Sequence, residues 1–165
     1  MDQIKCDVAI VGGGLAGGLI ALALARKRSE LKVVLIEADG HFGGNHIWSF
    51  FATDIDPASR WLTAPLVTYG WSGNEVRFPA YSRKLDSIYY SIESERLDEV
   101  IRTTLPRENL LTGKMVKAVS PRLVVLEGGQ RINAGGVIDA RGPGDLHHLD
   151  CGWQKFTGQL MQLSH

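Results

Sequence analysis

The most constraining feature of this sequence is an uncharged stretch of eighteen residues, 8–25, that contains five glycines. Its length meets the minimum for a membrane-spanning helix, and three alternating alanines at its end resemble a signal-peptidase site. Six of the seven residues 12–18 are glycine or alanine, however, which makes a poor helix centre, and the preceding residues carry two acids against one lysine. We therefore interpret the stretch as a strand, a turn and a helix.

The patterns within and after this stretch support that division. Residues 4–11 form an apolar run that predicts a buried parallel strand, and residues 15–28 are rich in Leu and Ala, which predicts a helix. Three cations end the helix, where its dipole favours positive charge. A second apolar run, residues 31–37, predicts another buried strand. Strand, helix and strand in this order form a βαβ unit, so we expect a parallel α/β sheet.

A glycine pattern, Gly12-x-Gly14-x-x-Gly17, falls on the first strand-to-helix turn, and Glu37 follows its last glycine by twenty residues. Gly12 permits the tight turn, Gly14 lets a pyrophosphate approach the backbone, and Gly17 lets the helix pack closely on the strand. Glu37 is expected to accept hydrogen bonds from ribose hydroxyls. In a chain with 19 glycines the spacing alone is weakly specific, but the strand, helix and acid around it indicate dinucleotide binding.

The glycines do not distinguish FAD from NAD, so the following segments must. A simple NAD domain continues at once with another helix and strand, whereas a Gly-rich aromatic loop follows Glu37 here. We expect an irregular insertion over about residues 46–92, because tryptophans and prolines are scattered through it. A helix is expected over residues 94–105, and Pro106 ends it.

Short strand patterns return in the last third of the chain. Residues 114–119, 122–127 and 130–133 alternate with turn residues, which predicts a three-stranded antiparallel meander. Residues 136–140 predict a further, separate buried strand that runs into Arg141 and a glycine loop. Loops of this kind are where open α/β sheets bind ligands.

The composition excludes several classes of function. Lys plus Arg and Asp plus Glu tie at 18 each, so no net field attracts nucleic acid, and we expect no nucleic-acid partner. The two cysteines lie far apart, which argues against a disulfide framework or a thiolate metal site and fits a reducing, cytoplasmic compartment. His147, His148 and Cys151 lie on one short loop with no second cluster to complete four ligands, so we expect no metal site.

Three segments of the chain resemble motifs of bacterial lycopene β-cyclases. They are GGNHIWSF at residues 43–50, VIDARGP at 137–143 and GWQKFTG at 152–158. The order of the expected elements also resembles the Rossmann-like FAD domain of glutathione-reductase-type flavoproteins. The resemblance implies an FAD-binding or NAD(P)-binding domain over residues 1–145 and the start of a substrate domain over residues 146–165, with the rest of that domain absent.

The same resemblance implies a chemistry. In it, reduced FAD assists a non-redox cyclisation of the linear ψ ends of lycopene to β rings, with NAD(P)H as the candidate reductant. An acid protonates a terminal double bond, and reduced flavin stabilises the developing cation. The family's proposed catalytic carboxylate lies in an acidic motif beyond the GWQKFTG segment. We therefore assign no catalytic residue and expect this chain to be an incomplete portion that is inactive alone.

The expected cofactor site gathers the glycine turn, the end of the second strand, the Gly-Gly loop, the meander and the last strand end. Its residues are Gly12, Gly13, Gly14, Leu15, Ala16, Gly17, Glu37, Ala38, Gly43, Gly44, His46, Val116, Arg141 and Gly142.

Several of these residues keep two interpretations. His46 lies near the flavin or the pyrophosphate, or it is a surface loop residue. Arg141 balances phosphate or flavin charge, or it is a solvated cation. Val116 contacts the adenine or simply packs. Trp48 offers a π face to a cationic intermediate, or it is an ordinary core or rim aromatic.

Two further function classes stay open. One is an FAD-dependent oxidoreductase or monooxygenase that uses NAD(P)H, and the other is a non-catalytic, truncated FAD-binding module. If lycopene or a related linear carotenoid is the substrate, it is dissolved in the membrane. The complete protein is then expected to contact the bilayer peripherally, although no amphipathic anchor helix is evident in this sequence.

Overall fold

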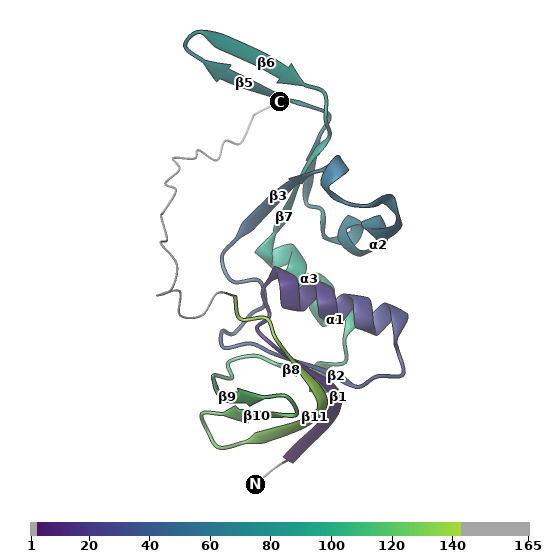
Figure 1. The fold of residues 1–165 in the computed structure, drawn as a ribbon, viewed down its shortest axis with the longest axis vertical. Helices are drawn as coiled ribbons and strands as arrows, with labels where there is room; N and C mark the ends of the chain where they lie inside the picture. Colours follow the sequence, from purple (N-terminus) through teal and green to yellow (C-terminus); the bar gives the residue numbers. More distant parts are fainter. Residues whose placement is uncertain (1–2, 143–165) are drawn as a thin grey trace.

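The chain folds around one six-stranded mixed sheet, seen in the lower half of Figure 1. The computed structural model describes residues 3–142. The strand order is β8-β2-β1-β11-β10-β9. These strands are β1 (Gln3–Val11), β2 (Val33–Ile36), β8 (Leu110–Leu111), β9 (Val116–Ser120), β10 (Leu123–Leu126) and β11 (Arg131–Asp139). β1 runs parallel to β2 and β11, and β8 runs parallel to β2, as expected of an α/β fold.

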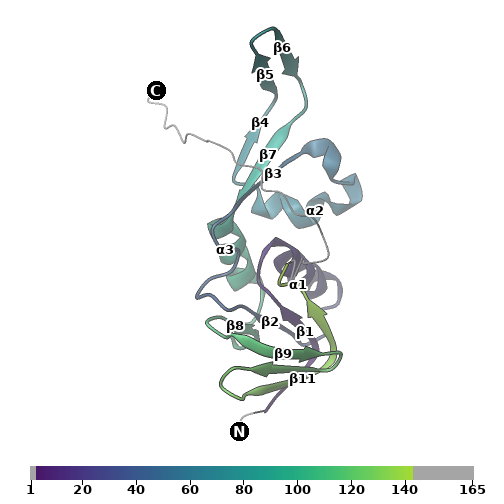
Figure 2. The ribbon, with the colours of Figure 1, turned by 60° about the vertical axis from the view of Figure 1, so that its left-hand side comes forward.

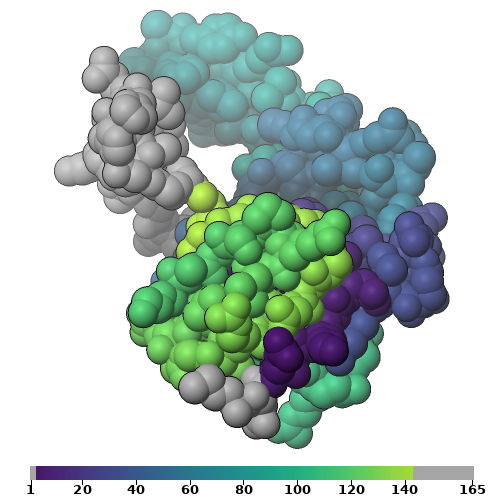
Figure 3. All heavy atoms as spheres, turned by 60° about the horizontal axis from the view of Figure 1, so that its bottom comes forward, coloured from purple at the N-terminus to yellow at the C-terminus, as the bar shows by residue number. Residues whose placement is uncertain are grey.

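Both faces of the sheet are buried at β2 and at the end of β1. Helices α1 (Leu15–Lys27) and α3 (Ser94–Thr104) cover one face, where Ile10 and Leu35 pack in one hydrophobic cluster with Leu97 and Ile101. Neighbouring strand residues point the other way, and they pack in a second cluster with residues of β10 and β11. Seen from below, β9, β10 and β11 (green to yellow-green) lie at the front of the molecule (Figure 3). Burial on both faces explains why the first two strands read as continuous apolar runs.

The uncharged stretch divides as the sequence predicts. β1 ends at Val11, the glycine turn follows, and α1 begins at Leu15 and ends in Arg26 and Lys27. The guanidinium of Arg26 lies 4.8 Å from the ring centroid of Trp61, so the end of α1 contacts the segment that contains Trp61. Within residues 3–142, no helix combines the length and the apolarity needed to cross a membrane.

The last strand differs from the prediction. We expected residues 130–133 and 136–140 to form two strands, but they form the single strand β11, so this prediction was wrong. The first half of β11 pairs antiparallel with β10, while its whole length pairs parallel with β1. Gly135 reads as a break in the sequence. Its missing side chain instead permits close approach, because a Cβ there would lie 2.8 Å from the Asp7 carbonyl oxygen.

The segment expected to be irregular is ordered, so that prediction was also wrong. Strands β3 (Ile47–Phe51), β7 (Tyr89–Glu93) and β4 (Tyr69–Trp71) form a three-stranded antiparallel sheet, and β5 (Asn74–Phe78) and β6 (Tyr81–Leu85) form a separate hairpin. The short helix α2 (Arg60–Thr63) lies between 3₁₀ turns at Ala52–Asp54, Pro57–Ser59 and Ala64–Leu66, and a fourth turn at Arg107–Asn109 follows α3. Strands of three to five residues are too short to show a clear alternation of apolar and polar residues in the sequence.

The two sheets lie in different parts of the molecule. Figures 1 and 2 show the three-stranded sheet extending away from the six-stranded one, with the hairpin β5–β6 at the far end. β7 leads directly into α3, so the second sheet is joined to the helix that covers the first. The loop that leaves β2 runs directly into the start of β3 at Ile47.

Candidate functional site

Two glycines of the turn between β1 and α1 are required by the chain itself. Gly12 has φ +100°, and a Cβ there would lie 2.7 Å from the carbonyl of Ala140 at the end of β11. A Cβ on Gly17 would collide with the Gly12 carbonyl oxygen and would lie 3.4 Å from the Ala140 Cβ. Gly17 thus lets α1 begin directly against the turn and the strand end. These two glycines bring the first turn of the helix to the carboxyl edge of the sheet.

Gly14 is different, because nothing among residues 3–142 requires a glycine there. Its backbone is extended, with φ −69° and ψ −171°, and a Cβ would meet no atom within 4 Å. The first hydrogen bond of α1 runs from the Gly18 N–H to the Gly14 carbonyl, 2.8 Å. The N–H groups of residues 15–17 precede that bond, and no acid occupies the first turn. The open space before Gly14 therefore faces backbone donors at the positive end of a helix, which fits a phosphate group.

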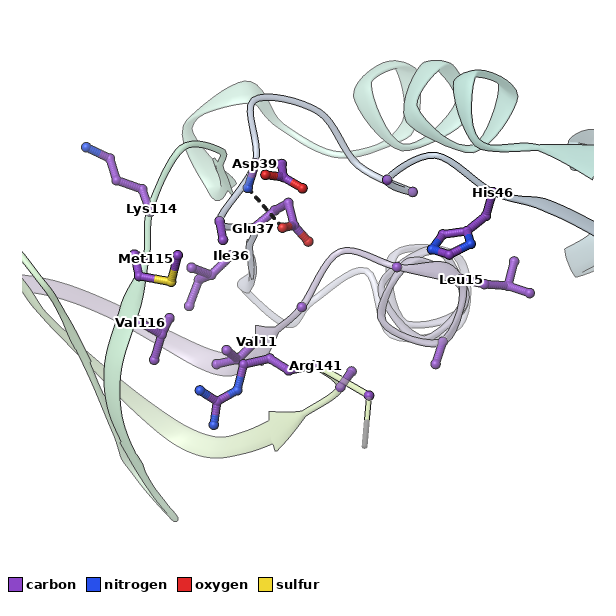
Figure 4. A pocket seen from close by; sticks show the side chains of 18 of the residues that line it. Val11, Leu15, Ile36, Glu37, Asp39, His46, Lys114, Met115, Val116 and Arg141 are labelled. Atoms are coloured by element: carbon purple, nitrogen blue, oxygen red, sulfur yellow. Dashed lines mark hydrogen bonds between the residues drawn. The ribbon is translucent and has the colours of Figure 1, made fainter. Parts of the chain in front are cut away.

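The carboxylate of Glu37 is held by two backbone amides. Its Oε2 accepts from the Gly13 N–H at 2.7 Å and its Oε1 accepts from the Asp39 N–H at 3.0 Å. Figure 4 draws the second of these bonds. A carboxylate oxygen accepts more than one hydrogen bond, so each oxygen keeps acceptor capacity toward the cavity. Gly13 is also fixed from the other side, since a Cβ there would collide with the ring of Phe42.

Helix α3 holds the Gly-Gly loop in place. The Phe42 N–H donates to Asp98 Oδ1 at 2.7 Å, and Arg102 donates to Asp98 Oδ2 at 2.7 Å and to the Gly40 carbonyl at 3.1 Å. Gly43 has φ +86°, and its N–H donates to the Gly13 carbonyl at 2.9 Å. Asp98 and Arg102 position the site although sequence reasoning missed them. The sequence does place the two residues four apart on a helix, but that spacing indicates only an ion pair on the helix surface, not a contact with the loop.

These elements enclose a cavity of about 490 Å³. Every residue expected in the cofactor site lines it except Gly13 and Gly17, which support the turn from behind. Residues that sequence reasoning left out of the site also line it: Val11, Ile36, Asp39, Trp48, Lys114, Met115 and Ala140. Most of these residues are sequence neighbours of predicted site residues at a strand end. The predicted strand ends could therefore have indicated them.

The cavity has two distinct ends (Figure 4). Lys114, Met115 and Val116 lie at one end, on the side of Glu37, and Val116 also packs against the second hydrophobic cluster. His46 lies at the other end beside α1, with its ring 5.6 Å from that of Trp48. The backbone amides at the start of α1 thus lie between the end with Glu37 and Val116 and the end with His46 and Trp48.

Arg141 lines the cavity, but its guanidinium is already paired within the chain. It donates through Nη2 to Asp139 Oδ2 at 2.6 Å and through Nε to Asp139 Oδ1 at 2.8 Å. This hydrogen bonding holds the pKa of the Asp139 carboxyl below its usual value and raises the pKa of Arg141. Both side chains are about half exposed, so the pair remains accessible to solvent.

The geometry suits a dinucleotide. The amides before α1 can hold a pyrophosphate, Glu37 can accept from a ribose, and the end near Val116 can take a purine. Within residues 3–142, Glu37 and Asp39 are the only carboxylates that line the cavity, and both lie away from His46. No cluster of potential metal ligands occurs in that range. The GWQKFTG segment and the loop with His147 and His148 lie outside the described residues.

Comparison with known proteins identifies relatives along nearly the whole chain. Residues 7–165 match the family model described as lycopene cyclase protein. A lycopene beta-cyclase from Pseudescherichia vulneris is 43% identical over 158 residues, which is 96% of this chain and 41% of that protein. A lycopene beta-cyclase from Pantoea ananas is 42% identical over 164 residues, 99% of this chain and 42% of that protein. The chain thus spans about two fifths of the length of these curated relatives.

Solved structures share the fold at low sequence identity. The p-nitrophenol 4-monooxygenase PnpA from Pseudomonas putida DLL-E4 matches with a TM-score of 0.64 and 18% identity, over 86% of this chain and 42% of that one. At this identity the likeness concerns the fold alone. It agrees with the Rossmann-like α/β architecture that the sequence predicts.

Proposed function

The chain belongs to the lycopene cyclase family, and from this premise we propose that it is the FAD-binding part of a lycopene β-cyclase. The observation that carries FAD binding is the open space beside Gly14, a glycine that neither its backbone conformation nor any neighbouring atom in the described part of the chain requires. The family membership supports the choice of a carotenoid cyclase over other enzymes with this fold.

In this proposal the cavity holds FAD along its length. The amides at the start of α1 bind the pyrophosphate, and Glu37 accepts hydrogen bonds from the ribose of the adenosine. Val116 and Met115 would contact the adenine, and Gly44 and His46 would lie beside the flavin ring. Reduced FAD supplies negative charge beside a developing cation when it is bound.

The second sheet offers a path for a linear polyene. Trp48 and Phe50 lie two residues apart on β3, so they share one face of the sheet. Trp48 lines the cofactor cavity, while Phe50 and Tyr90 line a second cavity of about 290 Å³. The rings of Phe50 and Tyr90 are 5.6 Å apart. An aromatic row whose members line both cavities suits an apolar chain and provides π faces that stabilise positive charge.

The remaining parts of the proposal follow the family. The reaction is an isomerase-type cyclisation of lycopene ends without net redox change, and NAD(P)H is the reductant that keeps FAD reduced. The protein works in the cytoplasm in peripheral contact with the membrane that dissolves its substrate. Within residues 3–142, no residue favours either alternative, the NAD(P)H-dependent oxidoreductase or the non-catalytic module.

A chimera tests this function. This chain replaces the matching two fifths of the Pantoea ananas relative, and the chimera is expressed in bacteria that accumulate lycopene. We expect β-carotene in the pigment extract, because this chain supplies a working cofactor site. The Gly14→Val chimera should form none, since the side chain fills the pyrophosphate space.

The matched control is Gly128→Val, at an exposed glycine that also has open space around its Cβ but lies outside the cavity. This chimera should keep its activity. If the unsubstituted chimera folds and retains FAD yet makes no cyclic carotenoid, while the parent relative does, the cyclase proposal fails.

A further inference from the structure

The hairpin β5–β6 presents two aromatic side chains to solvent at its tip. Phe78 and Tyr81 face each other across the turn, and they are 64% and 58% exposed. The two strands pair only with each other, in a sheet of their own. Figures 1 and 2 show the hairpin at the far end of the molecule from the six-stranded sheet. Large aromatic side chains exposed on a protruding tip indicate a contact with something outside the hairpin.

The pairing register sorts the hairpin residues onto two faces. Directly opposed residues of an antiparallel pair share a face, so Phe78–Tyr81, Val76–Arg83 and Asn74–Leu85 lie together. Glu75–Lys84 and Arg77–Ser82 form the other face. All the apolar side chains of the two strands are therefore on the first face, and none of them is fully buried. A two-stranded hairpin is marginally stable alone in water, so this face is expected to gain a partner.

The charge of the hairpin indicates the chemistry of that partner. Residues 74–85 hold three cations, Arg77, Arg83 and Lys84, against one acid, Glu75, although the whole chain has no net charge. Glu75 pairs with Arg77 at 2.8 Å. Within the described part of the chain, Arg83 and Lys84 form no ion pair. The local excess of positive charge favours an anionic surface and opposes contact with the same hairpin of a second copy.

We propose that the β5–β6 hairpin docks this protein on a lipid bilayer that carries anionic headgroups. The rings of Phe78 and Tyr81 enter the interface, where aromatic side chains are favoured, and Arg83 and Lys84 contact the headgroups. Long cationic side chains keep their charge in the headgroup layer while their stems lie along apolar surface. This inference rests on the proposed function, because it assigns the membrane contact of that function to named residues. Its evidence comes from the hairpin and not from the identity of the substrate.

Vesicle co-sedimentation of the full chain, with FAD added, tests the proposal. Vesicles contain phosphatidylcholine with phosphatidylglycerol, or phosphatidylcholine alone. We expect binding to the mixed vesicles, weakened by roughly tenfold or more in Phe78→Ser/Tyr81→Ser. Arg83→Gln/Lys84→Gln should weaken binding to the mixed vesicles by roughly tenfold and should leave the weak binding to neutral vesicles unchanged. The matched control is Ile47→Ser, at a residue that is 65% exposed on β3 and should bind as the wild type does.

A conservative variant guards against a folding defect. Phe78→Trp should keep vesicle binding, and its added tryptophan should be quenched by lipids brominated in the acyl chains. Equal sedimentation of the wild type and the Phe78→Ser/Tyr81→Ser variant overturns the proposal, as does the absence of added quenching. A dimer that this variant converts to a monomer, without vesicle binding by either, shows that a second copy covers the tip and also overturns it. Vesicle binding without FAD retention leaves the docking inference standing and removes the proposed function.

Discussion

The cofactor cavity and the β5–β6 hairpin differ in how far hydrogen bonds and packing within the chain hold their side chains. At the cavity, two backbone amides hold Glu37, Asp98 holds the loop, and fully buried residues such as Ile10 and Leu35 form the sheet behind it. The two strands of the hairpin contain no buried residue and expose their aromatic tip. The cavity is therefore held by hydrogen bonds and packing within the chain, whereas the hairpin leaves its apolar face exposed.

The largest effect is expected where the cavity depends on close backbone contact. Gly17→Val places a side chain on the Gly12 carbonyl oxygen, so the start of α1 must move. We expect a loss of roughly 3 kcal/mol or more in the free energy of unfolding, together with loss of FAD binding. Urea denaturation followed by fluorescence measures the first and flavin absorbance after gel filtration measures the second. Wild-type stability in this variant would show that the turn is not tightly packed.

Gly14→Val sharpens the comparison within the same turn. Open space surrounds this position, so the free energy of unfolding should change by less than about 1 kcal/mol. The valine occupies the pyrophosphate space, and FAD affinity should fall by roughly a hundredfold. Titration of FAD with each variant measures this difference, with Gly128→Val as the control. Equal loss of stability in Gly14→Val and Gly17→Val would remove the distinction between ligand space and packing.

Asp98→Ala tests whether α3 positions the Gly-Gly loop. The change leaves the Phe42 N–H without its acceptor and leaves the Arg102 guanidinium with only the Gly40 carbonyl. We expect a loss of about 1–3 kcal/mol in the free energy of unfolding, with weakened rather than abolished FAD binding. Glu99→Ala breaks only the exposed pair with Arg96 and is expected to change stability by less than about 0.5 kcal/mol. Thermal denaturation of both variants checks the contrast, and equal effects would argue against a positioning role for Asp98.

Replacing residues 74–85 by a short Gly-Ser linker tests whether the two regions are independent. The hairpin forms its own sheet and no hairpin residue lines the cofactor cavity, so FAD affinity should stay within about threefold of the wild-type value. FAD titration of the linker variant provides the measurement. A large loss of affinity would mean that the hairpin supports the cavity.

The smallest effect is expected at the Asp139–Arg141 pair. Because the pKa of Asp139 is lowered in the folded chain, the pair stabilises the fold above the ordinary carboxyl pKa, and this contribution is lost as the pH falls through the lowered value. Arg141→Gln should return the pKa of Asp139 toward its usual value and so remove this pH-dependent contribution to stability. An NMR titration of the Asp139 carboxyl in both proteins reports the shift. An unchanged titration curve would show that the pair does not form in solution.

The two regions also differ in how far the sequence predicts them. The βαβ unit and α3 were predicted to within two residues, because each is specified by one continuous segment with its own period and its own end signals. The cavity residues followed, since the glycines and Glu37 lie at the ends of those elements. Asp98 was missed as a site residue because its partner, the Phe42 N–H, is 56 residues away.

The second sheet was missed for a related reason. β3 pairs with β7 although their paired residues lie far apart in the sequence, as in the hydrogen bond between the Ser49 and Ser91 hydroxyls at 2.8 Å, which are 42 residues apart. Strands this short form only when their distant partner is present. Gly135 misled in the opposite way, since it lay between two predicted strands and serves instead as a place of close approach to β1.

Amide chemical shifts test the central claim most directly. FAD is titrated into ¹⁵N-labelled protein, and the shift of each backbone amide is followed. We predict that the largest changes occur at the N–H groups of Leu15, Ala16 and Gly17, with further changes at Glu37 and none at Phe78 or Tyr81. Binding of FAD with the largest changes elsewhere, or with none at the start of α1, would contradict the account.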